Sequence, residues 1–322
     1  MGSALAVLSR DLSRFLLIPA GMALLSLVVC VVSGEWFAIA PFLITLSSVA
    51  GLSGLLNYFG RSATERFSQR QTLISVAVGW ALVCAVGALP IWLTAMFVGA
   101  EATPTVAYFT NALNALFEGF SGFTSAGLTM VIRPSQLPVS LQWWRSFMQW
   151  VGGVGVIVLT VALLEPAQDQ YVLYQAEGRQ QRLRLTMTRT VRRIWAIYAG
   201  YTAVAILLFR LAGMTWWEAV NHSMSAISTG GFSITDGNMS SYGTAVKVVV
   251  MLVMLCGAIS FSVHDQLITK FRLTILLRDR QHFLLLGLLI VGAGVVGLEH
   301  YTFTGRFAWT DSIFQWVSAL TT

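Results

Sequence analysis

Seven apolar runs constrain the fold of this chain more than any other feature of its sequence. Each run is close to the roughly 20 residues that an α-helix needs to cross a bilayer. The runs are Phe15–Ser33, Trp36–Leu56, Leu73–Val98, Trp143–Leu164, Ile194–Gly213, Thr244–His264 and Phe283–Leu298. Of the 322 residues, 56% are hydrophobic and only 11% are charged, whereas about 25% are charged in soluble domains. The sequence therefore predicts an all-α polytopic membrane protein.

The basic residues lie in short connections between the apolar runs, although the formal net charge is +6. Most arginines and lysines fall in residues 57–72, 165–193 and 265–282, and connections rich in these residues face the cytoplasm. Two apolar runs precede the first of them, so the N-terminus is also predicted to be cytoplasmic, in a multi-pass protein of the cell membrane. This distribution indicates topology and lipid contact, and not a nucleic-acid partner.

Polar, glycine-rich stretches interrupt the chain in the poorly charged connections. The first is Phe117–Met130, and its pattern returns at Ser225–Gly231 and in part at Ser318–Thr322. The two complete copies share the motif Ser-[Gly/Ala]-apolar-[Ser/Thr]-[Ser/Thr]-x-Gly, and the third supplies its first five positions. The serines that open the copies lie about 100 residues apart, and such a period indicates repeated structural units.

A short helix is expected before each complete copy of the motif. At 1.5 Å per residue, Thr105–Phe120 would form a helix of about 24 Å and Trp216–Ile227 one of about 18 Å. Both are shorter than the roughly 30 Å hydrocarbon core of a bilayer, so both segments are predicted to be re-entrant. The C-terminal end of such a helix carries a partial negative charge that favours a cation, and the three motifs hold no basic residue.

The chain is predicted to consist of a helical hairpin followed by repeated helix–pore loop–helix units. The hairpin is residues 1–58, and the repeats are 73–165, 190–266 and an incomplete 280–322; a fourth repeat is absent. All units enter the membrane from the same side. They are therefore parallel repeats around a central ion pathway, unlike the inverted repeats of many secondary transporters.

The motif itself indicates ion binding by backbone carbonyls. Non-helical backbone inside a membrane is tolerated only where it is buried in protein or lines a watery cavity. Glycine permits dihedral angles that turn successive carbonyls toward one axis, and rings of such oxygens replace the hydration shell of an alkali cation. A single motif of this composition is more often a tight helix–helix contact, but its recurrence favours a selectivity filter.

Three segments around the motifs resemble signatures of the Trk/Ktr/HKT superfamily of potassium transporters, especially the bacterial Trk-type membrane subunit. They are Phe117–Gly127, Gln149–Ile157 and His222–Ser233. The resemblance implies a potassium uptake subunit with four helix–pore–helix repeats and an N-terminal hairpin. It also implies a K⁺ filter of backbone carbonyls from Thr124, Ser125, Ala126, Gly127, Ser228, Thr229, Gly230, Gly231, Thr321 and Thr322.

Further expectations follow from the resemblance. A glycine at the last filter position, here Gly127 and Gly231, is associated in the superfamily with preference for potassium over sodium. The resemblance implies a homodimer and a cytosolic, nucleotide-binding regulatory subunit of the RCK type that controls opening. The basic connection Arg179–Arg193 could dock that subunit or anionic lipid. The transported K⁺ is expected in the filter, with no cofactor.

The chain ends inside the third motif, where the resemblance predicts the rest of a filter segment. The gating loop of the third repeat and the fourth repeat are therefore missing. We expect the sequence to be part of a longer protein; the alternative is a half-channel completed by another polypeptide.

Three other functions are weighed against the potassium channel. A cation cotransporter working by alternating access would show inverted repeats and charged midplane residues. An enzyme would need polar catalytic groups that face one another within the spans. The sequence shows neither pattern, so no enzymatic activity is expected. A non-conducting or assembly-dependent membrane subunit stays open.

Several single residues have more than one interpretation. Glu118 is a hydrogen-bond acceptor that supports the filter, a carboxylate that attracts cations, or a partly solvated residue of the outer face. Lys247 is expected to extend its amine to the membrane surface, and His264 to mark an interfacial helix end. Gly152–Gly153 is expected to pack closely against a neighbouring helix.

Overall fold

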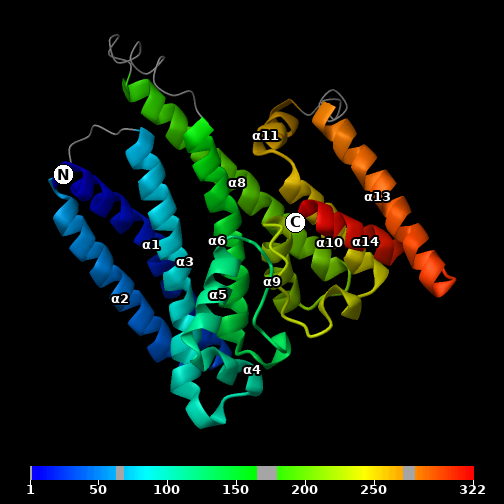
Figure 1. The fold of residues 1–322 in the computed structure, drawn as a ribbon, viewed down its shortest axis with the longest axis horizontal. Helices are drawn as coiled ribbons and strands as arrows, with labels where there is room; N and C mark the ends of the chain where they lie inside the picture. The colour runs from blue at the N-terminus through cyan, green and yellow to red at the C-terminus, as the bar shows by residue number, and fades with distance from the viewer. Residues whose placement is uncertain (1, 63–68, 165–179, 271–279) are drawn as a thin grey trace. The chain divides into compact units, whose positions relative to one another are not determined.

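The structure, a computed structural model, describes residues 2–62, 69–164, 180–270 and 280–322. Within these ranges the regular structure consists of helices joined by turns and loops (Figure 1). The described chain has five helices that are long and apolar enough to cross a membrane, and a bent helix pair that could form a sixth span. The prediction of an all-α polytopic membrane protein is confirmed.

The chain divides into two compact units. Unit 1 is Met1–Gln149 with Phe232–Asn238, and unit 2 is Trp150–Gly231 with Met239–Thr322. The second motif therefore ends where the chain returns from unit 2 to unit 1. The predicted boundaries of the hairpin and of the repeats stay predictions.

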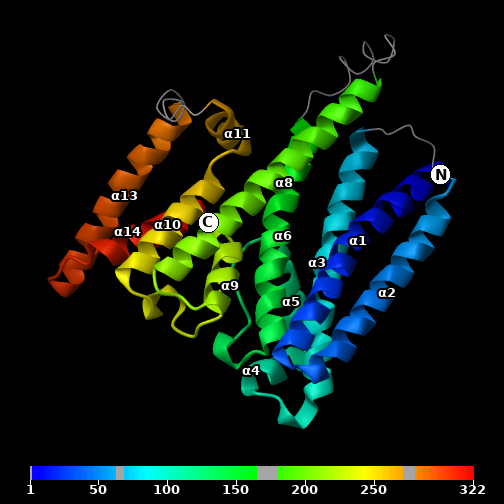
Figure 2. The same ribbon diagram turned by 180° about the vertical axis from the view of Figure 1, so that it is seen from behind.

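Unit 1 begins with a helical hairpin. α1 (Gly2–Ser33) and α2 (Trp36–Gly60) lie along each other, and α3 (Gln69–Val98) packs against both (Figure 2). Gly34 makes the turn between α1 and α2 at φ +72°, a conformation that glycine adopts without steric strain. Apolar side chains such as Leu16 form the buried seam between these helices.

The turn of the hairpin also caps the helix α6 (Val139–Leu164). The Glu35 carboxylate accepts hydrogen bonds from Val139 N at 2.6 Å and from Ser140 N at 2.8 Å. These two amides lie in the first turn of α6, where backbone donors lack partners within the helix, and the helix dipole favours an anion there. Glu35 thus fixes the hairpin to the start of α6.

The first short helix begins later than predicted. Instead of one helix over Thr105–Phe120, the structure has α4 (Pro104–Ala107), a 3-10 turn and then α5 (Ala112–Phe123). Asn111 is extended, and its side-chain oxygen accepts from Leu113 N at 3.0 Å. Because an asparagine in this position is a strong N-cap, it starts a new helix and breaks the predicted one.

Unit 2 holds the other two short helices. α9 spans Trp216–Ile227, which are the predicted bounds, and α14 spans Trp309–Thr321. Thr215 and Glu218 form a capping box at the start of α9, in which each side chain satisfies a backbone amide of the other. The long helices of unit 2 are α8 (Gln180–Leu211), α10 (Thr244–Ala258) and α13 (Arg280–Thr304).

The predicted continuous span Thr244–His264 is wrong. α10 ends at Ala258, and α11 (Phe261–Lys270) follows after a bend of 104°. Nε2 of His264 lies 2.8 Å from Cys256 O, and Nδ1 lies 2.9 Å from the Tyr201 hydroxyl. A side chain thus replaces the backbone partner that the Cys256 carbonyl would have in a continuous helix. His264 is buried and holds this bend, so its interpretation as an interfacial helix end is also wrong.

Candidate functional site

Each copy of the motif contains the end of a short helix, and the three helix ends share one backbone conformation. Ser125, Thr229 and Thr322 occupy the same motif position and have φ of +54°, +50° and +59°. In the described chain, four non-glycine residues have positive φ, and Ser125, Thr229 and Thr322 are three of the four. Left-handed backbone costs such residues on the order of 1 kcal/mol or more, and this strain concentrates at functional sites.

The two complete motifs also share a hydrogen-bond pattern. It is the Schellman arrangement that closes helices, in which the left-handed residue is usually glycine. The four bonds are Ala126 N to Ser121 O at 3.0 Å, Gly230 N to Ser225 O at 2.8 Å, Ser125 N to Gly122 O at 3.1 Å and Thr229 N to Ala226 O at 3.1 Å. In the third copy, Thr322 N donates to Ala319 O at 3.4 Å. This bond is equivalent to those donated by Ser125 N and Thr229 N.

Beyond the cap, the first motif presents its carbonyls without protein partners. In the part of the chain that the structure describes, no hydrogen bond is accepted by the main-chain oxygens of Thr124–Gly127. Gly127 and its counterpart Gly231 have φ of +76° and +82°, which any residue with a Cβ adopts only under strain. Thr124 and Ala126 are exposed and Ser125 and Gly127 are half-buried, so solvent can reach this segment and satisfy its carbonyls.

The second motif is packed between two helices at glycines. A Cβ added to Gly153 of α6 would lie 2.8 Å from Ser228 Cβ. A Cβ added to Gly257 of α10 would lie only 2.3 Å from Ile227 O. The predicted close packing is thereby confirmed for Gly153, and the neighbour that it contacts is the motif itself.

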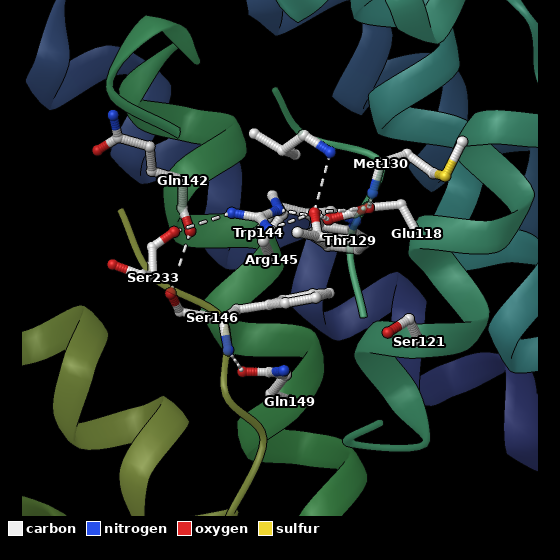
Figure 3. Close-up of polar contacts among 12 residues, drawn as sticks. Glu118, Ser121, Thr129, Met130, Gln142, Trp144, Arg145, Ser146, Gln149 and Ser233 are labelled. Carbon is white, nitrogen blue, oxygen red and sulfur yellow. Dashed lines mark hydrogen bonds and ion pairs between the residues drawn. The ribbon is translucent and has the colours of Figure 1, made fainter. Parts of the chain in front are cut away.

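A buried ion pair supports the chain that follows the first motif (Figure 3). Arg145 Nε of α6 lies 2.7 Å from Glu118 Oε1 of α5, and the two side chains are 2% and 0% exposed. Glu118 also accepts hydrogen bonds from Thr129 Oγ1 at 2.8 Å and from Met130 N at 2.9 Å. Glu118 is therefore a hydrogen-bond acceptor for this segment, and its interpretation as a partly solvated residue is wrong.

The same arginine contacts the chain that follows the second motif. Arg145 Nη1 donates to Ser233 O at 3.1 Å, and its guanidinium lies 4.2 Å from the centre of the Phe232 ring. One turn further along α6, Gln149 Oε1 accepts from Phe232 N at 3.1 Å (Figure 3). All of these residues belong to unit 1.

Comparison with known proteins decides the family. The profile of the TrkH family, described as cation transport proteins, matches residues 52–319. This chain belongs to the TrkH family. The match includes the first two motifs and ends just before Thr321.

Individual TrkH relatives agree with the family match. The Trk system potassium uptake protein TrkH of Halomonas elongata is 31% identical over 301 residues, which cover 90% of this chain and 59% of that protein. An uncharacterized cation transporter of Methanocaldococcus jannaschii is 35% identical over 199 residues, 62% of this chain and 40% of that protein. The chain thus spans less than two thirds of either relative.

A solved TrkH structure shares the fold. The crystal structure of the potassium transporter TrkH from Vibrio parahaemolyticus superposes with a TM-score of 0.77 at 24% identity, over 96% of this chain and 64% of that one. The similarity establishes the polytopic helical fold, with its short helices.

Arg145 of this TrkH chain contacts the segments after both complete motifs, but the sequence pattern alone did not single it out. It lies inside the predicted span Trp143–Leu164 and was counted with the apolar residues. An ionisable residue inside a membrane span is costly and usually functional, and that signal was available in the sequence.

Lys247, expected to extend its amine to the membrane surface, pairs with a carboxylate of another helix. Its Nζ lies 2.6 Å from Asp311 Oδ1, and its side chain is only 14% exposed. Asp311 lies in the first turn of α14, where a carboxylate is favoured by the helix dipole. The pair joins α10 to the short helix α14.

The predicted filter residues fall into separate groups. Thr124–Gly127 lies in unit 1, whereas Ser228–Gly231, Thr321 and Thr322 lie in unit 2. Thr321 Oγ1 lies 3.9 Å from the sulfur of Met254 in α10. The structure describes each motif by itself, and their union in one filter stays a prediction. Among the described residues there is no group of three or more His, Cys, Asp or Glu side chains that could hold a metal ion.

The start of α9 is expected to respond to pH. Burial favours the neutral acid, but hydrogen bonds from Thr215 N, Thr215 Oγ1 and Tyr242 Oη lower the pKa of Glu218 below its usual value. A carboxyl with a depressed folded pKa stabilises the fold above the unfolded pKa, about 4.3 for glutamate. That stabilisation disappears as the pH falls through the folded pKa.

We therefore expect the full-length wild type in detergent to unfold at a higher temperature than Glu218→Gln at pH 7. The difference should shrink steadily as the pH is lowered through the range below about 4.3. Tyr242→Phe, which removes one of the donors to Glu218, should show a smaller loss with the same pH dependence. A difference between wild type and Glu218→Gln that does not change with pH would contradict the assignment.

Proposed function

We propose that this TrkH-family protein is a potassium uptake subunit that selects dehydrated K⁺ with backbone carbonyls. The observation that carries the proposal is the recurrence of one strained backbone turn at Ser125, Thr229 and Thr322. Three unrelated helix contacts would have no reason to share a left-handed serine or threonine at the same motif position. The name of the Halomonas elongata relative, a potassium uptake protein, supports potassium as the cation.

In this proposal the filter carbonyls come from Thr124–Gly127, Ser228–Gly231 and the pair Thr321–Thr322. Their oxygens take the place of the hydration shell of K⁺, and a smaller cation gains less from the same spacing. The short helices α5, α9 and α14 end at these carbonyls, and the partial negative charge of each C-terminus adds to the attraction for a cation. No charged side chain is needed at the ion itself.

The partners belong to the proposal as well. We infer a homodimer in the lipid of the cell membrane, with a cytoplasmic N-terminus and a cytosolic RCK-type regulatory subunit. Relatives named as proteins of a Trk system support a multi-component assembly. The basic connection Arg179–Arg193 predicted to dock that subunit lies partly outside the described residues. A non-conducting or assembly-dependent membrane subunit is the alternative function.

Flux into liposomes that contain the full-length protein tests the proposal. Wild type is expected to take up K⁺ or Rb⁺ in preference to Na⁺. Gly231→Ser should reduce that preference by about tenfold, because Gly231 has φ +82° and a Cβ in that conformation strains the backbone and would turn its carbonyl away from the wild-type geometry.

Gly200→Ser in α8 is the matched control, because a Cβ at Gly200 would meet nothing within 4 Å. This variant should keep the preference of wild type. A wild type that carries no potassium, or a Gly231→Ser variant with unchanged ion preference, would refute the filter assignment.

A further inference from the structure

Arg145 lies where two separate chain segments are held, and each segment begins immediately after a motif glycine. After Gly127, the chain runs through Thr129, whose Oγ1 accepts from Arg145 Nη2 at 3.0 Å. After Gly231, it runs through Ser233, whose carbonyl accepts from Arg145 Nη1 at 3.1 Å. One guanidinium therefore bonds to the continuation of both motifs.

Glu118 completes this arrangement from the other side. Its carboxylate accepts from Arg145 Nε at 2.7 Å, from Thr129 Oγ1 at 2.8 Å and from Met130 N at 2.9 Å. The first segment is thus held by both members of the pair, and the second by the arginine. Phe232 covers one face of the guanidinium, with its ring centre at 4.2 Å.

Stability alone does not explain this buried pair. Removing two charges from water costs about as much as their attraction returns, and well-packed apolar residues of similar size often stabilise a fold at least as well. A fully bonded polar network does, however, specify one geometry. Arg145 and Glu118 bond not only to each other but also to the chain segments after both motifs. The network can therefore fix the backbone geometry of these segments.

We propose that the Glu118–Arg145 pair is a positioning device that fixes the backbone after the first and second motifs and thereby sets the ion preference of the filter. The second half of this inference rests on the proposed potassium filter, and the first half does not. Gly127 and Gly231 adjoin the held segments, and glycine offers little steric resistance to a change in dihedral angles. Without an external anchor, the carbonyls at these positions would be free to reorient.

The device requires arginine rather than any cation. The guanidinium is planar, and its fixed donors point in several directions at once. In this chain, they serve a carboxylate, a hydroxyl and a carbonyl. A lysine amine at the same position is a compact charge that can keep the contact with Glu118, but it cannot hold all three acceptors in this geometry.

The test compares two conservative cation changes in the full-length protein. Arg145→Lys keeps the positive charge and removes the planar set of guanidinium donors. Lys247→Arg is the matched control, because Lys247 pairs with Asp311 in unit 2 and bonds to neither held segment. In liposomes, the ratio of Rb⁺ to Na⁺ uptake is expected to fall about tenfold in Arg145→Lys and to stay at the wild-type value in Lys247→Arg.

Hydrogen–deuterium exchange tests the anchoring without transport. Peptides that cover residues 128–131 and 232–236 of purified Arg145→Lys should exchange about tenfold faster than those of wild type, whereas Lys247→Arg should leave them unchanged. Faster exchange together with a lower ratio supports the inference. Unchanged exchange, or an unchanged ratio in a folded Arg145→Lys variant, overturns it.

Two provisions keep the outcomes separate. If wild type itself shows no preference for potassium, the proposed function fails, and exchange still decides whether the pair anchors both segments. If Arg145→Lys does not fold, the double variant Glu118→Gln, Arg145→Gln replaces it, since neutral amides leave no buried charge unpaired. The double variant is expected to show the same loss of preference and the same faster exchange, and wild-type values for both would overturn the inference.

Discussion

Gly257→Ala is expected to displace the second motif and to reduce potassium flux at least tenfold. The added methyl carbon would lie 2.3 Å from Ile227 O and 3.2 Å from Thr229 Cγ2. The first of these atoms belongs to the backbone of α9, so it cannot move aside as the end of a flexible side chain can. Overpacking of this kind costs about 1–3 kcal/mol. The displacement passes directly to Ser228, the first predicted filter residue of the second repeat.

Gly200→Ala is the control for this prediction. It adds the same methyl group to α8, where nothing lies within 4 Å of the added carbon. Alanine favours a helix over glycine by about 1 kcal/mol, so this variant should be at least as stable as wild type. Thermal unfolding of the full-length protein in detergent and Rb⁺ uptake in liposomes measure both effects. Equal stability and equal uptake for the two variants would show that α10 does not hold the motif at Gly257.

The parts of the fold that local sequence signals encode could be predicted. The bounds of α9 follow from a capping box at Thr215 and an apolar face that ends at Ile227. The start of α5 could also have been found, because Asn111 precedes the helix and asparagine is a preferred N-cap. The repeat of the motif was readable because its residue types recur in order.

Contacts between distant segments could not be predicted in the same way. The break after Ala258 lies in a long apolar run, so hydropathy gives no sign of it. The hydrogen bond between the His264 ring and the Cys256 carbonyl, which accompanies the break, cannot be read from the sequence. The partner of Arg145 lies 27 residues earlier in the chain. One charge in a long apolar run hardly changes the average hydropathy, so the span Trp143–Leu164 reads as apolar although an arginine inside a membrane span indicates a functional residue.

Removing one member of the Glu118–Arg145 pair is expected to have the largest effect on stability. Glu118→Leu leaves the guanidinium buried, at 2% exposure, without its carboxylate. Loss of one partner of a buried pair costs about 3–5 kcal/mol, largely because the remaining charge is uncompensated. Arg145→Met should cost a similar amount for the same reason, measured as the unfolding of the full-length protein in detergent.

The double variant Glu118→Leu, Arg145→Met distinguishes a contribution of the pair to stability from a contribution to the geometry of the segments after the motifs. It leaves neither charge behind, so it should be more stable than either single variant. The cost of the double variant minus the sum of the two single costs measures the coupling between the two side chains. Lys247→Met is the control, because its partner Asp311 is 62% exposed and water can solvate it, so the cost should stay below about 1 kcal/mol. If the costs of the two single variants simply add, the side chains act independently and the coupling is absent. If the double variant is stable but the backbone after Gly127 and Gly231 exchanges faster, the pair serves the geometry of these segments more than the stability of the fold.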